Sequence, residues 1–484
     1  MPPLKGYYDP YITPKWIWSM VFALFLIITW MWKECLYPNL KHILLNKSPH
    51  MPLIMVMCIC GLVLFSKFNK SEVDEYMMFE NSTVISLHLC ILLPFVFEKK
   101  IYPFSYIIWP FILTALLLLQ CRTAYICIFV YITSVHSHCK WNILFPIVFA
   151  ISIALFTKSD STRGRWFIIN NTFELIKQEP VIGYGYNGFG KNYMLQQENY
   201  FRNHPNSEFA ILSDNIHHPL NEFLFVTVNG GLVGLILLLI ILCGPFLYNI
   251  NGVRNSPLLL SLITICIFSL FSYPLRYPLT WVIITFNWIK YLKKLFSRFS
   301  SRIIFSIVCI IISIVIMREN YYLRKWGRIS YIAHNGHPYA MMNKYKSLYT
   351  HFRHSSYFIY DYAIESYCAK QLKVSNHLLR DLEGIQTDYE TTLLHGDVFF
   401  HQGAYNSALS YYEKASYMCP VRFAPLEGML QVYENTNQIE KGKQIARIIL
   451  NKQIKVYSYD VTLIKKKAAR FMDKTPPANQ VMKK

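Results

Sequence analysis

Residues 222–248 read EFLFVTVNGGLVGLILLLIILCGPFLY, an apolar run whose only charged side chain, Glu222, stands at its first position. A helix needs about 20 apolar residues to cross the hydrocarbon core of a bilayer, and this run is long enough. Similar apolar runs lie on both sides of it, near residues 16–32, 51–66, 82–97, 101–119, 121–135, 141–157, 256–273, 277–292 and 303–317. The pattern predicts an all-α, polytopic transmembrane helix bundle with about ten to twelve spans.

The composition agrees with a membrane protein. Hydrophobic residues make up 53% of the chain, and the formal net charge is +20. In a soluble protein such a charge would suggest nucleic-acid binding. Lys and Arg, however, collect in the cytoplasmic loops of membrane proteins, where they set the orientation of the spans. We therefore attribute the charge to membrane topology.

The apolar runs divide the chain into four parts. Residues 1–157 hold spans one to six, residues 158–221 form a large polar loop, residues 222–317 hold spans seven to ten, and residues 318–484 form a soluble helical tail. A basic run from Lys290 to Arg302 precedes the last span. Because positive residues stay on the cytoplasmic side, we expect the polar loop and the tail to face outward.

The tail shows a period of about 34 residues, which is typical of helix-pair repeats. Its units start at residues 358, 392 and 426. The middle unit resembles a tetratricopeptide (TPR) repeat, because small residues let paired helices pack closely and a proline ends the second helix: Gly396, Gly403, Tyr405, Ala408, Tyr411, Ala415 and Pro420. Such arrays bind peptides or partner proteins, and the alternative is a packing cap without a ligand of its own.

The polar loop is the part of the chain in which we expect the chemistry. Long loops in compact proteins are usually functional or disordered, and this loop is too rich in Trp, Tyr and Phe to be disordered. Near its start, Trp166, Ile169, Phe173 and Ile176 recur at helical spacing. The spacing predicts an amphipathic helix that lies at the membrane surface.

Five short motifs follow one another between residues 110 and 240. They are Arg122-Thr123-Ala124 at a span end, Gly164-Arg165 before the amphipathic helix, Glu179-Pro180-Val181-Ile182-Gly183-Tyr184-Gly185, a histidine-containing segment that ends at Asn221, and Gly231-Leu232-Val233-Gly234. In this order they resemble the signature region of the O-antigen ligase and O-antigen polymerase superfamily. That superfamily comprises bacterial membrane glycosyltransferases and includes protein O-oligosaccharyltransferases.

The resemblance implies a GT-C-like bundle in the bacterial inner membrane, with its active site and tail in the periplasm. It implies transfer of a glycan from a polyprenyl (undecaprenyl) diphosphate carrier to an acceptor hydroxyl, without a metal or other cofactor. The acceptor could be the lipid A core, the growing glycan or a protein. We favour an O-antigen ligase of lipopolysaccharide or surface polysaccharide biosynthesis, because an exterior repeat domain could recruit a partner; polymerase and protein transfer stay open.

Two arginines are the candidates for diphosphate binding. Arginine stays charged and holds phosphate through a planar fork of donors. Arg122 is flanked by apolar sequence, where a charge is costly unless it has a function or reaches the interface at a helix end. Arg165 occupies a position that the resemblance also links to the diphosphate, and its alternative is an ordinary solvated charge.

A histidine is the candidate general base. The resemblance places the family's catalytic His directly before the Asn, but here that position is Leu220, so the role passes to His218. Its ordinary pKa suits proton transfer near neutrality, although a surface histidine without a role is the alternative. Asp214 and Glu222 are the fallback carboxylates. The motif residues Gly183, Gly185, Asn221, Gly231 and Gly234 are expected to be structural.

Two sequence patterns suggest other kinds of site, and two other classes of protein are alternatives to this interpretation. GYGYNG at residues 183–188 fits a dinucleotide-binding motif literally, but no strand precedes it, so we expect a tight turn. His136, His138 and Cys139 are too few and too crowded for a metal site. A transporter of polyprenyl-linked sugars would need ionisable residues near mid-span. A scaffold without catalysis would leave the arginines and glycines of the loop unexplained.

Overall fold

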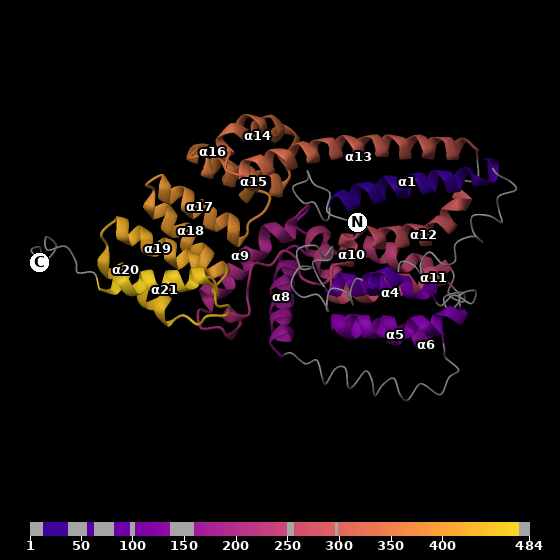
Figure 1. Ribbon diagram of the computed structural model, residues 1–484, viewed down its shortest axis with the longest axis horizontal. Helices are drawn as coiled ribbons and strands as arrows, with labels where there is room; N and C mark the ends of the chain where they lie inside the picture. The colour runs from indigo at the N-terminus through magenta and orange to yellow at the C-terminus, as the bar shows by residue number, and fades with distance from the viewer. Residues whose placement is uncertain are drawn as a thin grey trace, which may run out of the picture. The chain divides into compact units, whose positions relative to one another are not determined.

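The structure is a computed structural model that describes residues 13–36, 56–61, 82–96, 102–135, 159–248, 256–295 and 299–473 (Figure 1). Within these ranges every regular element is a helix, as the sequence predicts. The chain divides into two compact units. The first, which we call the bundle unit, comprises residues 1–157, 220–223 and 235–328. The second, the loop–tail unit, comprises residues 158–219, 224–234 and 329–484.

The bundle unit is made of the apolar helices. Its described helices are α1 (Thr13–Leu36), α4 (Ser82–Val96), α5 (Tyr102–Leu119), α6 (Arg122–Val135), α11 (Pro257–Phe271) and α12 (Pro278–Leu295), with most of α10 (Glu222–Tyr248) and α13 (Phe299–His334). Helix α4 packs against α5, α6 and α11, and α12 packs against α1 and α11. These bounds follow the apolar runs of the sequence. The run at 141–157 lies outside the described residues, and of the run at 51–66 the structure describes only the helical residues 56–61.

Two stretches in the described part of the chain are helical, long enough and apolar enough to cross a membrane by length and composition: Glu222–Leu247 and Arg302–His334. Five shorter apolar helical stretches accompany them, namely Trp16–Phe25, Ser82–Val96, Pro110–Leu119, Arg122–Tyr131 and Pro257–Phe271. The number of spans given by the sequence stays a prediction.

The loop–tail unit joins the polar loop to the tail. The loop contributes α8 (Ser159–Gln178), α9 (Gly188–Asn203) and the short 3-10 helix η3 (Glu208–Ile211). The tail forms α14 (Pro338–Phe352), α15 (Ser356–Cys368), α16 (Leu372–Glu383), α17 (Tyr389–His401), α18 (Tyr405–Met418), α19 (Ala424–Asn435), α20 (Ile439–Asn451) and α21 (Tyr459–Met472). Each tail helix packs against the next in the chain.

The tail helices repeat with the period seen in the sequence. Helices α16, α18 and α20 begin at residues 372, 405 and 439. The ring of Tyr412, which is buried, fills the space between α17 and α19: a Cβ atom added to Gly396 or to Gly428 would meet it at 2.7 and 2.6 Å, respectively. The absence of a side chain at these two positions therefore leaves room for the Tyr412 ring.

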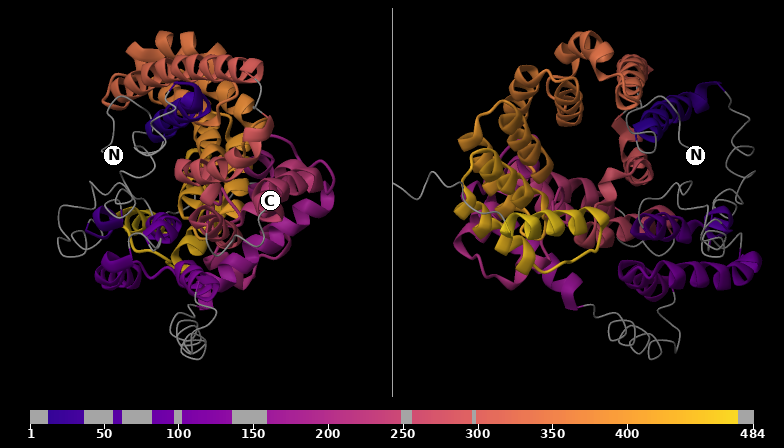
Figure 2. Two further views of the ribbon diagram at one scale, coloured as in Figure 1. Left: turned by 90° about the vertical axis from the view of Figure 1, so that its right-hand side faces the viewer. Right: turned by 60° about the vertical axis from the view of Figure 1, so that its left-hand side comes forward.

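The polar loop and the middle of the tail share one hydrophobic core. Leu175 of α8 and Met194 of α9 pack in the same cluster as Tyr389, Met418 and Cys419 of the tail. Figure 2 shows magenta helices of the loop beside orange and yellow helices of the tail. Within this core, α9 of the loop contacts α18 of the tail. The buried amide of Gln197 reinforces this core, because its Nε2 donates to the carbonyl of Met418 at 2.6 Å.

Candidate functional site

The signature loop at residues 179–185 docks into a break in α10. The helix is interrupted at Gly231, where φ is 61° and ψ is −159°. Across the break, Tyr184 N donates to Val228 O at 2.9 Å, Gly185 N donates to Asn229 O at 2.8 Å, and Leu232 N donates to Pro180 O at 2.9 Å. The loop thereby satisfies backbone groups that an interrupted helix leaves without helical partners.

Glycine is required on both sides of this contact. A Cβ atom at Gly231 would lie 2.1 Å from Val181 O, and one at Gly183 would lie 2.6 Å from Val228 O. Both residues also have positive φ values, 61° and 71°. The glycines of GYGYNG and of the GLVG motif therefore serve one close backbone approach. Gly185, with φ of 81°, completes the turn, and at Gly234 an added Cβ atom would lie 3.3 Å from the Val226 side chain.

Asn229 fastens the following helix to the same place. Its Oδ1 accepts a hydrogen bond from Phe189 N at 3.1 Å, at the start of α9, and its Nδ2 donates to Phe225 O at 2.7 Å. The sequence analysis did not single out this residue. Its position directly before Gly230-Gly231 was the available signal, because an amide side chain can replace backbone partners where a helix breaks.

The histidine segment lies beside the first part of α10. The His218 imidazole stacks on Phe225, with ring centroids 4.5 Å apart and ring planes inclined by 24°. His218 is partly exposed, and two residues later Leu220 has φ of 55°, a left-handed conformation that is unusual for Leu. The stacking fixes the orientation of the ring, and the backbone at Leu220 turns sharply into α10.

The two fallback carboxylates are both engaged. Asp214 Oδ1 accepts from Arg422 Nη2 at 2.8 Å and from Arg422 Nε at 3.0 Å, so this carboxylate joins the loop to the tail. Glu222 is buried, and its Oε1 accepts from Leu275 N at 2.8 Å. Both groups thus have structural contacts that a free general base would not need.

Asn221 and Glu222 connect the start of α10 to the segment between α11 and α12. Asn221 Nδ2 donates to Leu270 O at 3.0 Å, next to the Glu222 contact with Leu275. The expected structural role of Asn221 thus has a concrete bond. The segment continues into the 3-10 helix η5 (Pro274–Arg276), whose last residue, Arg276, is exposed.

Arg122 stands at the first position of α6. The chain turns from α5 into α6 at Gln120, which has φ of 49°, and the Arg122 side chain is exposed. On α4, Cys90 Sγ lies 4.0 Å from Ala124 O, and the His88 ring lies 5.9 Å from the Tyr277 ring.

Residues 88 and 90 are only about 3 Å apart along a helix axis, at 1.5 Å per residue. Ala124, near the start of α6, lies beside Cys90, and Tyr277, just before α12, lies beside His88. The starts of α6 and α12 therefore lie at about the same height along α4, which we call one level of the bundle unit. Arg276 is a second exposed cation at this level, and the sequence analysis did not propose it for binding.

Arg165 lies in the first half of α8 and is exposed. The helix has two apolar faces. Phe167, Ile168 and Leu175 are buried, whereas Trp166 is 59% exposed and Phe173 is 47% exposed. Of the predicted apolar stripe of Trp166, Ile169, Phe173 and Ile176, the two aromatic rings are exposed, whereas Ile176 packs against the core.

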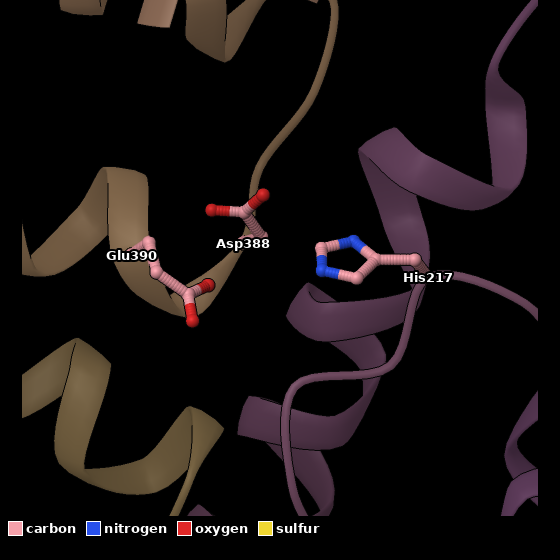
Figure 3. Close-up of side chains that lie close together, drawn as sticks. All are labelled: His217, Asp388 and Glu390. Atoms are coloured by element: carbon pink, nitrogen blue, oxygen red, sulfur yellow. The ribbon is translucent and has the colours of Figure 1, made fainter. Parts of the chain in front are cut away.

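In the part of the chain that the structure describes, two groups of side chains have atoms close enough together to hold a metal ion. His217, Asp388 and Glu390 form the first, and Figure 3 shows the imidazole pointing from the loop toward the two carboxylates at the start of α17. Asp388 already caps α17 through Thr391 N at 2.9 Å, and Glu390 accepts from Asn215 Nδ2. The Glu390 contact thus joins the loop to the tail, whereas the Asp388 contact lies within the tail.

The second group lies in the tail. In it, His334 Nδ1 lies 2.9 Å from Glu365 Oε1, and Asp361 accepts from Tyr345 OH at 2.8 Å. Burial raises the pKa of Glu365, and the His334 imidazole opposes this shift. His136, His138 and Cys139 lie outside the described residues.

Comparison with known proteins identifies the class. Residues 15–239, slightly less than half of the chain, match the family described as O-antigen ligase, and this match supports a relationship to the O-antigen ligase superfamily of membrane glycan transferases. None of the curated proteins compared with the chain matches it.

Proposed function

We propose that the protein transfers a glycan from a polyprenyl diphosphate carrier to an acceptor hydroxyl, as an O-antigen ligase does. The observation that carries the proposal is the docking of residues 180–185 into the α10 break at Gly231. It explains why two motifs that resemble the family signature are present together, since each supplies the backbone partners of the other. The proposal places the donor in the bacterial inner membrane and the reaction on its periplasmic side.

The exposed arginines would hold the carrier diphosphate. Arg122 and Arg276 lie at one level of the bundle unit, and Arg165 belongs to the loop helix. Fixed guanidinium groups stabilise the charge that develops on a departing diphosphate more than the charge of the bound substrate, which lowers the barrier to transfer. This assignment needs no metal ion.

His218 would accept the proton of the acceptor. In the step, the acceptor hydroxyl gives its proton to the imidazole while its oxygen bonds to the anomeric carbon. The bond between that carbon and the diphosphate oxygen breaks, and polyprenyl diphosphate leaves with the electron pair. Stacking on Phe225 holds the ring in one orientation. Asp214 and Glu222 remain the fallback carboxylates; a side chain or backbone donor engages each of them.

The exposed stripe of α8 would rest on the membrane surface. Trp and Phe prefer the interface between headgroups and acyl chains, and an arginine beside them can reach the phosphate layer. Trp166, Phe173 and Arg165 meet this description. Arg165 would then lie at the depth where a lipid carrier presents its diphosphate.

The tail favours a ligase, or transfer to a protein, over a polymerase. It is a stack of helix hairpins with the spacing of TPR repeats, and we propose that it recruits the acceptor or an assembly partner. A transporter of lipid-linked glycans is a weaker candidate, because it offers no role for the loop that fills the α10 break.

Reconstitution would test the proposal. The purified protein in vesicles, supplied with a polyprenyl-diphosphate oligosaccharide and lipid A core, should release polyprenyl diphosphate and label the core. Arg122→Ala and Arg165→Ala should each lower the rate by about 100-fold or more, the usual cost of removing one preorganised donor to a developing anion.

Lys177→Ala is the matched control for Arg165→Ala, because Lys177 lies on the same helix and pairs only with Glu174, at 2.7 Å, among the ion pairs described. It should leave the rate unchanged. Equal rates in all three variants would contradict the assignment of the arginines. Donor consumption with product in a protein or glycan acceptor instead would identify the other branches of the family.

A further inference from the structure

A cavity of about 380 Å³ lies within the loop–tail unit, between the loop and the tail. One wall comes from the loop, through Tyr186, Asn187, Gly190 and His217, and the other comes from the tail, through residues 351–352, 354–357 and 385–386. This volume falls in the range of about 300–1,000 Å³ that is usual for small-ligand sites.

The seam beneath the cavity is held by hydrogen bonds. Asn187 Nδ2 donates to Ile385 O at 3.0 Å, and Thr387 N donates to Gly190 O at 3.2 Å. On the His217 side, Asn215 Oδ1 accepts from Tyr389 N at 3.4 Å. The two walls thus belong to one bonded assembly, so the cavity has a defined shape.

The lining is aromatic and polar. Among the described residues that line the cavity there is no Asp, Glu, Lys or Arg. Tyr186 is 92% exposed and Tyr357 is 61% exposed, so both rings are accessible. Around them stand the hydroxyls of Ser355 and Ser356, the amides of Asn187 and Gln386, and the imidazoles of His217, His351 and His354.

This chemistry matches a neutral carbohydrate. The C–H face of a sugar ring is weakly positive and packs on the negative face of an aromatic ring. Its hydroxyls both donate and accept, as do amides, neutral imidazoles and serine hydroxyls. A phosphate, nucleotide or acidic peptide would call for lysine or arginine in the lining.

The cavity also lies next to the proposed base. His217 lines it and directly precedes His218 in the chain, so their Cα atoms are about 3.8 Å apart. Tyr186 directly follows Gly185, which is hydrogen-bonded to the α10 break. At His217, the loop wall of the cavity continues into the histidine segment. At Tyr186, it continues into the loop that docks into the α10 break. The proposed function uses both of these motifs.

We propose that this cavity binds the terminal neutral sugars of the acceptor glycan, and that the tail thereby selects the acceptor. The inference rests on the proposed function, since it assigns the acceptor side of the same reaction. Sugars bound between Tyr186 and Tyr357 would direct a free hydroxyl toward His218. The tail is then part of the substrate site as well as a candidate recruiter of partners.

Two measurements test the inference. In the transfer assay with lipid A core, Tyr186→Ala and Tyr357→Ala should each raise the KM for the acceptor about tenfold, as expected for the loss of an aromatic anchor. The KM for the donor and kcat should stay unchanged. Tyr339→Ala is the matched control, because Tyr339 is 74% exposed on α14 and does not line the cavity.

The second measurement does not depend on catalysis. The intact protein, in detergent and without donor, is applied to an array of neutral and acidic bacterial oligosaccharides, first as wild type and then as Tyr186→Ala and Tyr357→Ala. Binding to neutral glycans that both variants lose and Tyr339→Ala keeps would support the cavity even if transfer failed. Unchanged binding and unchanged acceptor KM in both variants, or binding to acidic glycans alone, would overturn it.

Discussion

The two long apolar helices in the described part of the chain, α10 and α13, differ in whether the helix is continuous. Helix α13 is a continuous helix of 36 residues, whereas α10 is interrupted at Gly231 and accepts the loop at residues 180–185. Both contain a stretch that is long and apolar enough to cross a membrane, so this property alone does not separate them. The difference teaches that a broken helix persists where another segment supplies its backbone partners, and in this protein that segment is the family signature loop.

The largest effect is expected when the break in α10 is blocked. Gly231→Ala would place a Cβ atom 2.1 Å from Val181 O in a backbone conformation that Ala disfavours. The cost should reach about 4 kcal/mol or more, the range of severe destabilisation. Thermal unfolding in detergent and the transfer rate both report it, and we expect little folded, active protein.

Gly230→Ala is the control for this substitution. No atom outside the helix backbone lies within 4 Å of a Cβ atom at Gly230. This variant should be as stable as the wild type or slightly more stable, because Ala favours a helix over Gly by about 1 kcal/mol. If the two variants behaved alike, the close approach of loop and helix would not be required.

The next largest effect, a loss of transfer rate, is expected when the proposed general base His218 is replaced. His218→Ala should lower the transfer rate by about 100-fold or more, as the loss of a general base does. Adding Leu220→His should restore part of the rate, since it returns the family pattern of His before Asn221. His tolerates the left-handed backbone found at residue 220, where φ is 55°, better than Leu does.

Steady-state rates of His218→Ala, Leu220→His and the double variant decide the matter. Full activity in His218→Ala would remove His218 from the mechanism. A double variant as slow as His218→Ala would show that position 220 cannot take over the role.

A smaller loss of stability is expected when a polar side chain at the α10 break is removed, and almost none when a polar side chain in α13 is removed. Asn229→Ala removes the acceptor of Phe189 N and should cost about 1–3 kcal/mol, the penalty of leaving a buried donor without a partner. Ser313 in α13 donates only to Cys309 O in its own helix, at 2.9 Å, among the hydrogen bonds described. Ser313→Ala should therefore change stability by less than about 0.5 kcal/mol. Denaturant unfolding of both variants makes the comparison, and equal losses would contradict it.

The smallest effect concerns the seam that holds the loop against the tail. Burial, and next the neighbouring Asp388 carboxylate, raise the pKa of Glu390 above its ordinary value of 4.5. The folded protein thus binds this proton more tightly than the unfolded chain does. Its stability should fall as the pH rises from about 4.5 through the raised pKa.

Glu390→Gln should flatten this pH dependence and raise Tm near neutrality by no more than about 2–4 °C. Melting curves between pH 4.5 and 7.5 measure it. Asp460→Asn, at an exposed position at the start of α21, is the control and should keep the wild-type slope. A Glu390→Gln slope equal to that of the wild type would refute the assignment.

The sequence by itself indicated the apolar helices, the period of the tail and the resemblance to the O-antigen ligase superfamily. Apolar length, Gly396 and Ala408 in the repeat, and the order of the arginine and glycine motifs are local properties, and local properties are readable along a chain. It also singled out Gly183 and Gly231, but it explained the first by a turn alone and did not predict that the two lie against each other.

Only the tertiary structure decided which distant segments meet. That Gly183 lies against Gly231, that Asp214 pairs with Arg422, and that Tyr186 and Tyr357 line one cavity depends on contacts between residues far apart in the chain. No periodicity or composition encodes such pairs, because they arise when the loop and the tail bury a common core. Local sequence therefore predicts the helices, whereas the proposed acceptor cavity forms only when those helices pack together.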